Sequence, residues 1–211
     1  MKQTIEGFVP SAVLDAVAAP TPTYGGGSVA ALAGALAAAL VQMHAGLTVG
    51  KTAYAAVEPE MQAILQQAES LRGSLAEAAQ QDSDAYAAVM QAFAMPKETV
   101  ADKTARSVEI EKAMIHAAAV PIRTARLSVD VLGLAKRVAE KGNASCVCDS
   151  GVASYMAVAA LKGALLNVEI NAREIKNPGV VATLRAESMI LQKKGAALAE
   201  EIDQVIAKRL A

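Results

Sequence analysis

The chain has 211 residues, of which 54% are hydrophobic but only 3% aromatic, so Ala, Val and Leu supply most of its apolar mass. Its 20 Lys and Arg residues are balanced by 21 Asp and Glu residues, for a net charge of −1, which excludes the broad basic field that holds a nucleic-acid backbone. The length predicts a single domain, residues 1–211, and the composition predicts that this domain is all-α.

Helix-breaking segments divide the chain into six predicted helical stretches. The breakers are PTPTYGGG at 20–27, Gly50 with Lys51, MPKET at 95–99, EKGN at 140–143 and KNPG at 176–179. The stretches accordingly cover about 4–18, 28–50, 59–94, 102–140, 144–172 and 179–211. Since no alternating strand pattern competes with them, the predicted fold is an up-and-down bundle of about six helices.

The first two stretches bear on where the protein works. Glu6 stands where a secretory signal peptide would have its apolar core, so we expect a cytoplasmic protein. The second stretch has the length of a membrane span, because no charged residue occurs between Asp15 and Lys51. Alanine dominates it, however, and three polar residues interrupt it: Gln42, His44 and Thr48. These features favour a central, Ala-rich core helix that makes no membrane contact.

Small residues recur on several faces of this second stretch, at Ala30, Gly34, Ala38 and Ala45. They allow neighbouring helices to approach closely, as expected for a helix that is surrounded by others or that lies at a subunit interface. We therefore expect a homodimer as the minimum, and the sequence leaves the size of any larger homo-oligomer open.

Three glycines, Gly25, Gly26 and Gly27, precede Ser28 at the start of the central helix. Such a turn exposes backbone N–H groups to an anion or to a polar ring, which makes it a candidate binding site. The alternative is a flexible connection in which Ser28 caps the helix. Neither GxxxxGKS/T nor GxGxxG is present, so the turn does not predict a nucleotide-binding loop.

The third stretch has an apolar stripe that a carboxylate interrupts. Its apolar members are Met61, Leu65, Ala68, Leu75, Ala79, Tyr86, Val89 and Phe93. Asp82 lies seven residues after Leu75 and seven before Val89, so two helical turns place all three on one face. Burial would raise the pKa of such a carboxylate and suit it to general acid and base catalysis. The alternatives are a buried salt bridge and a miscounted stripe.

Polar residues also mark the fifth stretch. Asn143 is expected to cap its start, whereas Asp149 lies late for a helix-dipole role and is a candidate to face a pocket. Asn167 and Asn171 are four residues apart, so both amides project from one face, between apolar residues. Buried amides need hydrogen-bond partners, and the sequence leaves other helix ends and a heteroaromatic ligand as the alternatives.

The cysteines and histidines do not predict a metal site. Cys146 and Cys148 lie two residues apart in a helix, where their side chains diverge, so we expect free thiols in a reducing compartment. Together with His44 and His116 they form no zinc-ligand spacing. Both histidines stand alone in apolar stretches and are interpreted as helix-packing residues.

Six ordered motifs cover nearly the whole chain: PTPTYGGGSVAALAGALAAAL, TVGKTAY, DSDAYAAVMQAFAMPKET, AEKGN, CDSGVA and LLNVEINA. In this order they resemble the cyclodeaminase and cyclohydrolase family. The members most similar in pattern are stand-alone methenyltetrahydrofolate cyclohydrolases and the cyclodeaminase domain of formiminotransferase-cyclodeaminase. The resemblance implies a helical subunit that dimerises and that binds its folate substrate near the glycine turn. The implied reaction needs no cofactor beyond the tetrahydrofolate substrate.

The resemblance also assigns roles to single residues. Asp82 matches the aspartate that acts as the catalytic acid and base. Five further residues match motif positions and are candidates for substrate binding: Lys51, Lys141, Asn143, Asp149 and Asn167. Lys51 is the candidate partner for the anionic glutamate tail of the substrate.

One departure from the family pattern concerns the glycine turn. Family members read PTPGGGS, whereas this chain has Thr23 and Tyr24 inserted before the glycines, so Tyr24 is a candidate to line, cover or block the folate site. The predicted function is hydrolysis of methenyltetrahydrofolate to formyltetrahydrofolate. Release of ammonia from formiminotetrahydrofolate and a non-catalytic folate-binding or assembly role are the alternatives.

Overall fold

The structure, a computed structural model, describes residues 11–211. Its α-helices are α2 (Ser11–Ala18), α3 (Gly26–Gly46), α4 (Glu58–Ala94), α5 (Val100–Lys141), α6 (Val147–Ala172) and α7 (Pro178–Leu210). Three short 3-10 helices lie between them: η1 (Pro22–Tyr24), η2 (Thr52–Val57) and η3 (Ala144–Cys146). No strand occurs within residues 11–211, so the all-α prediction is confirmed.

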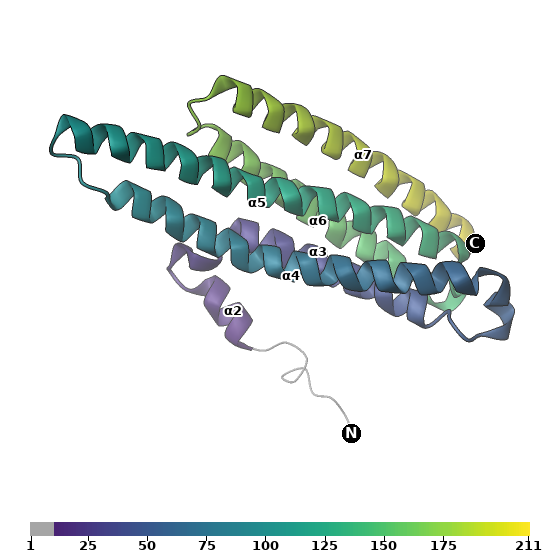
Figure 1. Ribbon diagram of the computed structural model, residues 1–211. Coiled ribbons are helices and arrows are strands. Elements are labelled where there is room, and N and C mark those ends of the chain that lie inside the picture. Colours follow the sequence, from purple (N-terminus) through teal and green to yellow (C-terminus); the bar gives the residue numbers. More distant parts are fainter. Residues whose placement is uncertain (1–10) are drawn as a thin grey trace.

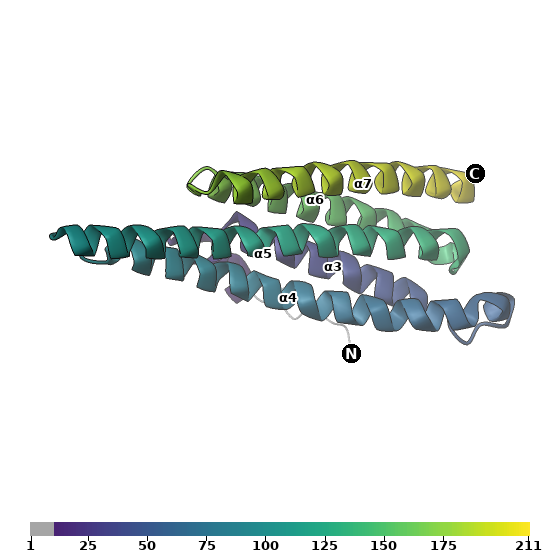
Figure 2. The same cartoon turned by 45° about the horizontal axis from the view of Figure 1, so that its top comes forward.

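The six helices correspond to the six stretches that the breakers predict. The first stretch is seen only from Ser11, and its part at 4–10 lies outside the described residues. Helices α3 to α7 alternate in direction along one long axis, since short connections join them (Figures 1 and 2). Helix α5 packs against α3, α4, α6 and α7, which confirms the predicted up-and-down bundle.

Close packing around α3 depends on residues without bulky side chains. Helix α3 packs against α4, α5 and α6, and alanines supply most of its buried positions. A Cβ atom at Gly34 would lie 3.0 Å from Leu75 of α4 and 3.4 Å from Ala160 of α6. A Cβ atom at Gly163 of α6 would lie 3.1 Å from Ala30. The small residues of α3 therefore admit neighbouring helices on two sides, as predicted.

Helix α3 ends at Gly46 rather than at Gly50, where the sequence predicted its end. The hydroxyl of Thr48 donates to the carbonyl of His44 and accepts from the backbone N–H of Asn143, both at 2.9 Å. These bonds hold the segment after α3 against Asn143 at the start of η3, so the helix does not continue to Gly50. Gly50, with φ of 77°, takes the left-handed conformation that this turn requires.

The fully buried His44 ties three helix ends together. One ring nitrogen lies 2.7 Å from the hydroxyl of Ser150, and the other lies 2.9 Å from the carbonyl of Asn143. Burial lowers the pKa of His44, so the ring is neutral near pH 7, donating to the carbonyl and accepting from the hydroxyl. The predicted packing role of His44 is confirmed.

The other histidine and the cysteines occupy simpler positions. His116 is exposed on α5, so its predicted packing role is wrong. The buried face of α5 is formed by its neighbours Ala117 and Ala118, and the side chain of His116 points to solvent instead. Cys146 is buried, Cys148 is exposed, and both are free thiols. The prediction that the two cysteines do not pair is therefore confirmed.

Helix α5 runs through Pro121 without a break. Proline has no N–H group, so the carbonyl of Ala117, four residues earlier, loses its helical donor. The side-chain amide of Asn171 on α6 donates to this carbonyl at 2.8 Å. The amide thus compensates for the proline and fixes α6 against α5.

Two helices, Gly26–Gly46 and Ala144–Ala172, are long and apolar enough to cross a membrane. Half of the most apolar segment of each is buried among the other helices, which is the packing of a core helix. The exposed part carries large apolar side chains, namely Val29, Leu36 and Met43 on α3 and Val152 and Leu166 on α6. One side of α3 and α6 therefore remains apolar and uncovered in the described chain.

The packing of α3 predicts opposite effects for two similar glycine substitutions. Gly34→Ala inserts a methyl group between α4 and α6, and we expect it to destabilise the fold by about 1–3 kcal/mol. Gly73→Ala on α4 meets no atom within 4 Å and should stabilise the helix by up to about 1 kcal/mol. Thermal unfolding of both variants beside the wild type measures the two effects. An unchanged melting temperature for Gly34→Ala would contradict the tight packing.

Candidate functional site

A pocket of about 470 Å³ lies beyond the first turn of α3. Helices α4, α5 and α6 continue past this turn (Figure 1). Its walls come from four helices. The lining residues that carry polar, aromatic or large apolar groups are Asp82, Tyr86, Met90, Phe93, Met114, Asn167, Ile170, Asn171 and Glu174. Gly25, Gly26 and Gly27 close its inner end. We call it the Asp82 pocket.

The half-buried carboxyl group of Asp82 lies against the first turn of α3. The hydroxyl of Ser28 is 3.0 Å from Oδ2 of Asp82 and 2.9 Å from the carbonyl of Ala79. Burial raises the pKa of Asp82, and hydrogen bonds from the hydroxyl and the backbone N–H of Ser28 oppose this rise. Asp82 has no salt-bridge partner in the described part of the chain. A buried salt bridge therefore does not explain its position.

Ser28 can serve both protonation states of Asp82. When the carboxylate is ionised, the hydroxyl donates to it. When Asp82 is protonated, the carboxyl O–H can donate to the hydroxyl oxygen, which then donates to the carbonyl of Ala79. In both states the carboxyl group and the hydroxyl are hydrogen-bonded to each other, so Asp82 can gain or lose a proton while the heavy atoms stay in place.

Gly27 is required by space rather than by backbone conformation. A Cβ atom at this position would lie 2.2 Å from Oδ1 and 2.6 Å from Cγ of Asp82. Gly25 and Gly26 meet no such obstacle: the first has open space, and the second faces the amide nitrogen of Asn167 at 3.6 Å. The first-turn N–H groups of a helix lack intrahelical acceptors and carry partial positive charge. The glycines therefore leave these groups accessible beside the carboxyl group.

Two aromatic side chains that the sequence placed in the core stripe belong to the pocket instead. Tyr86 and Phe93 are more than a third exposed and line its wall with Met90. They follow Asp82 at helical spacing, so this spacing was the signal that could have identified them. Periodicity puts them on the inner face of α4, but α3 does not extend far enough to cover them. Their rings offer flat apolar surfaces to a heteroaromatic ligand.

Two amides complete the pocket on the α6 side. Asn167 donates to the carbonyl of Gly163 in its own helix at 2.9 Å, and Asn171 donates to Ala117. Among the described residues no donor reaches either side-chain oxygen, so both remain available to accept from ligand N–H groups. The prediction that Asn167 and Asn171 share one face is confirmed, and Asn171, which was left without an assigned role, is a pocket residue.

Four predicted binding residues lie at the opposite end of α3. Helix α3 has 21 residues and therefore separates its two ends by about 30 Å. Lys51 precedes η2, and Lys141 pairs with Glu60 at 2.8 Å. Asn143, only 5% exposed, caps η3 as predicted. The prediction that Asp149 lies too late for a helix-dipole role is wrong: α6 begins at Val147, so Asp149 lies in its first turn and complements the dipole. Within one chain the structure does not bring these four residues to Asp82.

The inserted Tyr24 does not line the Asp82 pocket. It lines a separate apolar hollow of about 330 Å³, beneath α2, together with Val13, Val17 and Leu32. The 3-10 turn η1 turns this side chain towards α2 rather than towards α6. The inserted residues therefore do not block the site in the way that the sequence left open.

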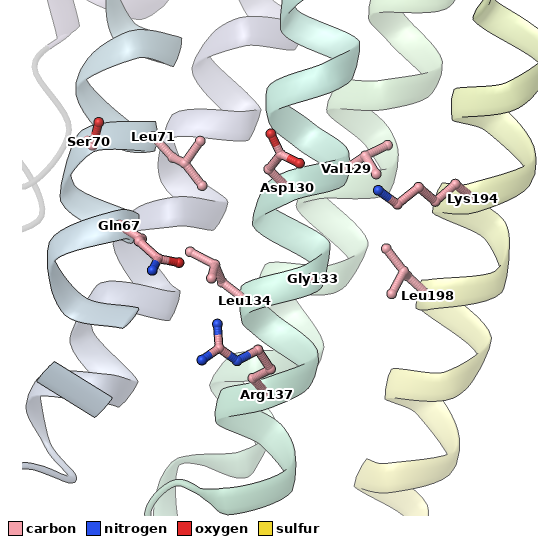
Figure 3. A pocket seen from close by; sticks show the side chains of 10 residues that line it. All are labelled: Gln67, Ser70, Leu71, Val129, Asp130, Gly133, Leu134, Arg137, Lys194 and Leu198. Carbon is pink, nitrogen blue, oxygen red and sulfur yellow. The ribbon is translucent and has the colours of Figure 1, made fainter. Parts of the chain in front are cut away.

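A groove on another side of the bundle is less suited to chemistry. It runs over α5 between α4 and α7, and its charged residues are Asp130, Arg137 and Lys194 (Figure 3). Arg137 is already paired with Glu60 at 3.0 Å. Its carboxyl group, Asp130, is exposed in the middle of α5, so this groove lacks a half-buried carboxyl group beside a helix start like that of Asp82.

Known proteins match the chain over most of its length. The formiminotransferase-cyclodeaminase family matches residues 11–189. A methenyltetrahydrofolate cyclohydrolase from Methylorubrum extorquens is 38% identical over 208 residues, which cover 99% of this chain and 98% of that protein. The formimidoyltransferase-cyclodeaminase of Mus musculus is 29% identical over 172 residues, 82% of this chain but 31% of the longer relative.

A solved structure shares the whole fold. The crystal structure of a formiminotetrahydrofolate cyclodeaminase from Thermotoga maritima superimposes with a TM-score of 0.87 at 28% sequence identity. The match covers 99% of this chain and 100% of the other. The arrangement of helices around the Asp82 pocket is thus shared with a protein of that description.

The raised pKa of Asp82 predicts a pH-dependent effect on stability. Because folding raises this pKa above 3.8, the folded state holds the proton more tightly than the unfolded state. The ionised group therefore destabilises the fold at neutral pH, and the effect fades as the pH falls towards 3.8. We expect Asp82→Asn to raise the melting temperature at pH 7, with a gain that shrinks on acidification. Thermal unfolding followed by circular dichroism tests this, and a gain that is independent of pH would refute it.

Proposed function

The chain belongs to the formiminotransferase-cyclodeaminase family, and on this premise we propose that it is a methenyltetrahydrofolate cyclohydrolase with Asp82 as its acid-base group. The observation that carries the proposal is the half-buried carboxyl group of Asp82, held at the start of α3 on the wall of an aromatic-lined pocket. The choice of cyclohydrolase activity is supported by similarity to a methenyltetrahydrofolate cyclohydrolase along nearly its full length.

The pocket offers complementary groups to methenyltetrahydrofolate. The substrate carries a positive charge that is delocalised over the bridge carbon and its two nitrogens, and the Asp82 carboxylate attracts this charge. In the proposed complex, Tyr86 and Phe93 pack against the flat rings of the substrate. The side-chain oxygens of Asn167 and Asn171 accept hydrogen bonds from the N–H groups of the pterin.

The proposed reaction begins with water. Asp82 accepts a proton while the water oxygen bonds to the bridge carbon, which neutralises the cation and forms a tetrahedral adduct. The bond from this carbon to one ring nitrogen then breaks, that nitrogen takes the proton from Asp82, and the hydroxyl of the adduct loses its proton to form the formyl carbonyl. One water is consumed and one proton is released overall. No oxidation state changes, so no redox cofactor is needed, and we propose that the reaction uses no cofactor beyond the substrate.

The position of Ser28 supports repeated proton transfer at Asp82. The hydroxyl donates to the carboxylate before water attacks, and it accepts from the protonated carboxyl group afterwards. In the second state the hydroxyl of Ser28 donates its hydrogen bond to the carbonyl of Ala79. Ser28 thus holds the carboxyl group in one orientation throughout the cycle.

Cyclodeamination of formiminotetrahydrofolate is the second candidate, favoured by the shared fold with a cyclodeaminase. In this reaction a second nitrogen of the folate bonds to the formimino carbon to close the methenyl bridge, and the formimino nitrogen leaves as ammonia. A proton must reach the departing nitrogen, and Asp82 is placed to supply it. A non-catalytic folate-binding role is the remaining alternative. We further propose that the protein acts in the cytoplasm as a homodimer or larger homo-oligomer, without nucleic-acid or membrane partners.

Turnover by two carboxylate variants tests the role of Asp82. Asp82→Asn keeps the shape of the side chain but removes the base, and we expect a loss of about 100-fold or more in kcat. Asp84→Asn changes an exposed carboxylate two residues away, which bonds to Gln80, and should be nearly silent. The measurement is the decay of methenyltetrahydrofolate absorbance, corrected for spontaneous hydrolysis. Near-normal turnover by Asp82→Asn would show that Asp82 is not the catalytic base. If the wild type releases ammonia from formiminotetrahydrofolate but does not hydrolyse methenyltetrahydrofolate, the protein is a cyclodeaminase.

The pH profile of Ser28→Ala provides a second test. As the base, Asp82 must be ionised, so activity should fall on the acid side as the pH passes through its raised pKa. The Ser28 hydroxyl favours the carboxylate and lowers this pKa, so Ser28→Ala should move the acid limb of kcat to higher pH. Ser70→Ala, an exposed serine on the same helix as Asp82, serves as the control. If the acid limb does not move in Ser28→Ala, the group that causes it is not Asp82.

A further inference from the structure

The side-chain amide of Asn171 is held by a partner that can only accept. Its nitrogen donates to the carbonyl of Ala117 at 2.8 Å, across the contact between α6 and α5. A carbonyl oxygen has no hydrogen to donate, so the opposite orientation of the amide would place two oxygens against each other. The nitrogen of Asn171 must therefore face α5, and its side-chain oxygen must face away from this bond.

The carbonyl of Ala117 depends on this bond because of Pro121. In an ordinary helix the carbonyl would accept from the N–H group of residue 121, which proline lacks. Ala117 is only 7% exposed, and a buried carbonyl without a donor costs free energy. The loss of one N–H group in α5 thus holds an amide of α6 in a single orientation.

Asn167, one helical turn before Asn171, is held less firmly. Its amide nitrogen donates to the carbonyl of Gly163 at 2.9 Å. In the regular helix α6 this carbonyl also accepts from the backbone N–H group of Asn167, so it does not depend on the side chain. Asn167 can give up its side-chain bond to suit a ligand, whereas Asn171 cannot do so without leaving a buried carbonyl unpaired.

The fixed oxygen of Asn171 gives this wall of the pocket a preference among ring ligands. Asn171 and Ala117 both line the Asp82 pocket. The lining residues within the described chain include the carboxyl groups of Asp82 and Glu174 but no Lys or Arg. A ring that directs an N–H group at the oxygen of Asn171 forms a hydrogen bond. A ring that directs a carbonyl at the same place meets oxygen instead and binds less tightly.

We propose that Asn171 is a specificity-determining residue of the Asp82 pocket and that Pro121 is its positioning residue. Because the amide is held by Ala117, its oxygen selects rings that present an N–H donor at this wall, such as 2-amino-4-oxopteridines, over rings that present an acceptor there. The choice of ring rests on the proposed function, since the pterin of a folate is a ring of this kind. The orientation of the amide does not rest on the proposed function.

Binding of two pteridines tests the selection. Pterin carries a 2-amino group, and lumazine has an oxo group at that position, so an acceptor replaces a donor. We expect the wild type to bind pterin about tenfold more tightly than lumazine in equilibrium dialysis, the effect of one hydrogen bond. In Pro121→Ala a backbone N–H group serves the carbonyl and releases the amide, so the preference should fall to about threefold or less. Pro59→Ala, at a first-turn proline that interrupts no helical bond, is the control and should keep the preference.

The ratio of the two dissociation constants separates the possible results. A merely structural effect of Pro121→Ala would weaken both ligands alike and leave the ratio at its wild-type value, which would overturn the positioning role. Equal affinity of the wild type for the two pteridines would overturn the selection, even if methenyltetrahydrofolate is turned over normally. If the wild type binds neither pteridine, the selection is also overturned, and turnover of methenyltetrahydrofolate shows whether the proposed function fails with it.

The orientation of the amide is tested without a ligand. Asn171→Ala should lower the melting temperature by about 3–8 °C, because it leaves the carbonyl of Ala117 unpaired. In the Pro121→Ala background the same change should lower it by less than about 2 °C, since a backbone N–H group then serves the carbonyl. Asn167→Ala is the matched control and should have the same effect in both backgrounds. If Asn171→Ala also has equal effects in the two backgrounds, Pro121 does not hold the amide, and the proposal is overturned.

Discussion

The contact between the carboxyl group of Asp82 and the first turn of α3 determines much of the surrounding structure. Gly27 must lack a Cβ atom for the carboxyl group to fit, and the hydroxyl of Ser28 then holds it in place. The same contact fixes where α3 begins relative to α4. Because α4, α5 and α6 run on beyond this point, the bundle has an opening at the position where a charged group is available. The pocket exists because α3 does not extend as far along the bundle as α4, α5 and α6.

A site of this kind explains how related proteins with different names can share one fold. Hydrolysis of a methenyl bridge and loss of ammonia from a formimino group both require a proton to be taken up and given back near the same carbon. A carboxyl group with a raised pKa, and with a hydrogen-bond partner for each protonation state, meets both requirements. Under the proposed function, the distinction between the two reactions depends on which substrate the pocket walls admit rather than on the acid-base group.

The sequence predicted the helices and the position of Asp82 well, because breakers and apolar periodicity report on local structure. It did not predict that Tyr86 and Phe93 line a pocket. Periodicity puts them on the inner face of α4, but it does not tell that α3 ends before it reaches them. The end of α3 was also missed, because the segment after it is held by a bond between Thr48 and Asn143, which is 95 residues away in the sequence. Nor do the motifs reveal that Lys51 and Asp82 lie at opposite ends of α3.

The bond from Asn171 to the carbonyl of Ala117 links the backbone of α5 to the wall of the pocket. Pro121 creates the need for this bond, so the two residues are structurally coupled although they lie on different helices. A relative that replaces the proline regains a backbone donor for the carbonyl and sets the amide free to bind a substrate. Loss of the amide while the proline remains would instead leave a buried acceptor unsatisfied. The order in which lineages can change these two positions is therefore constrained, and the proline is expected to change first.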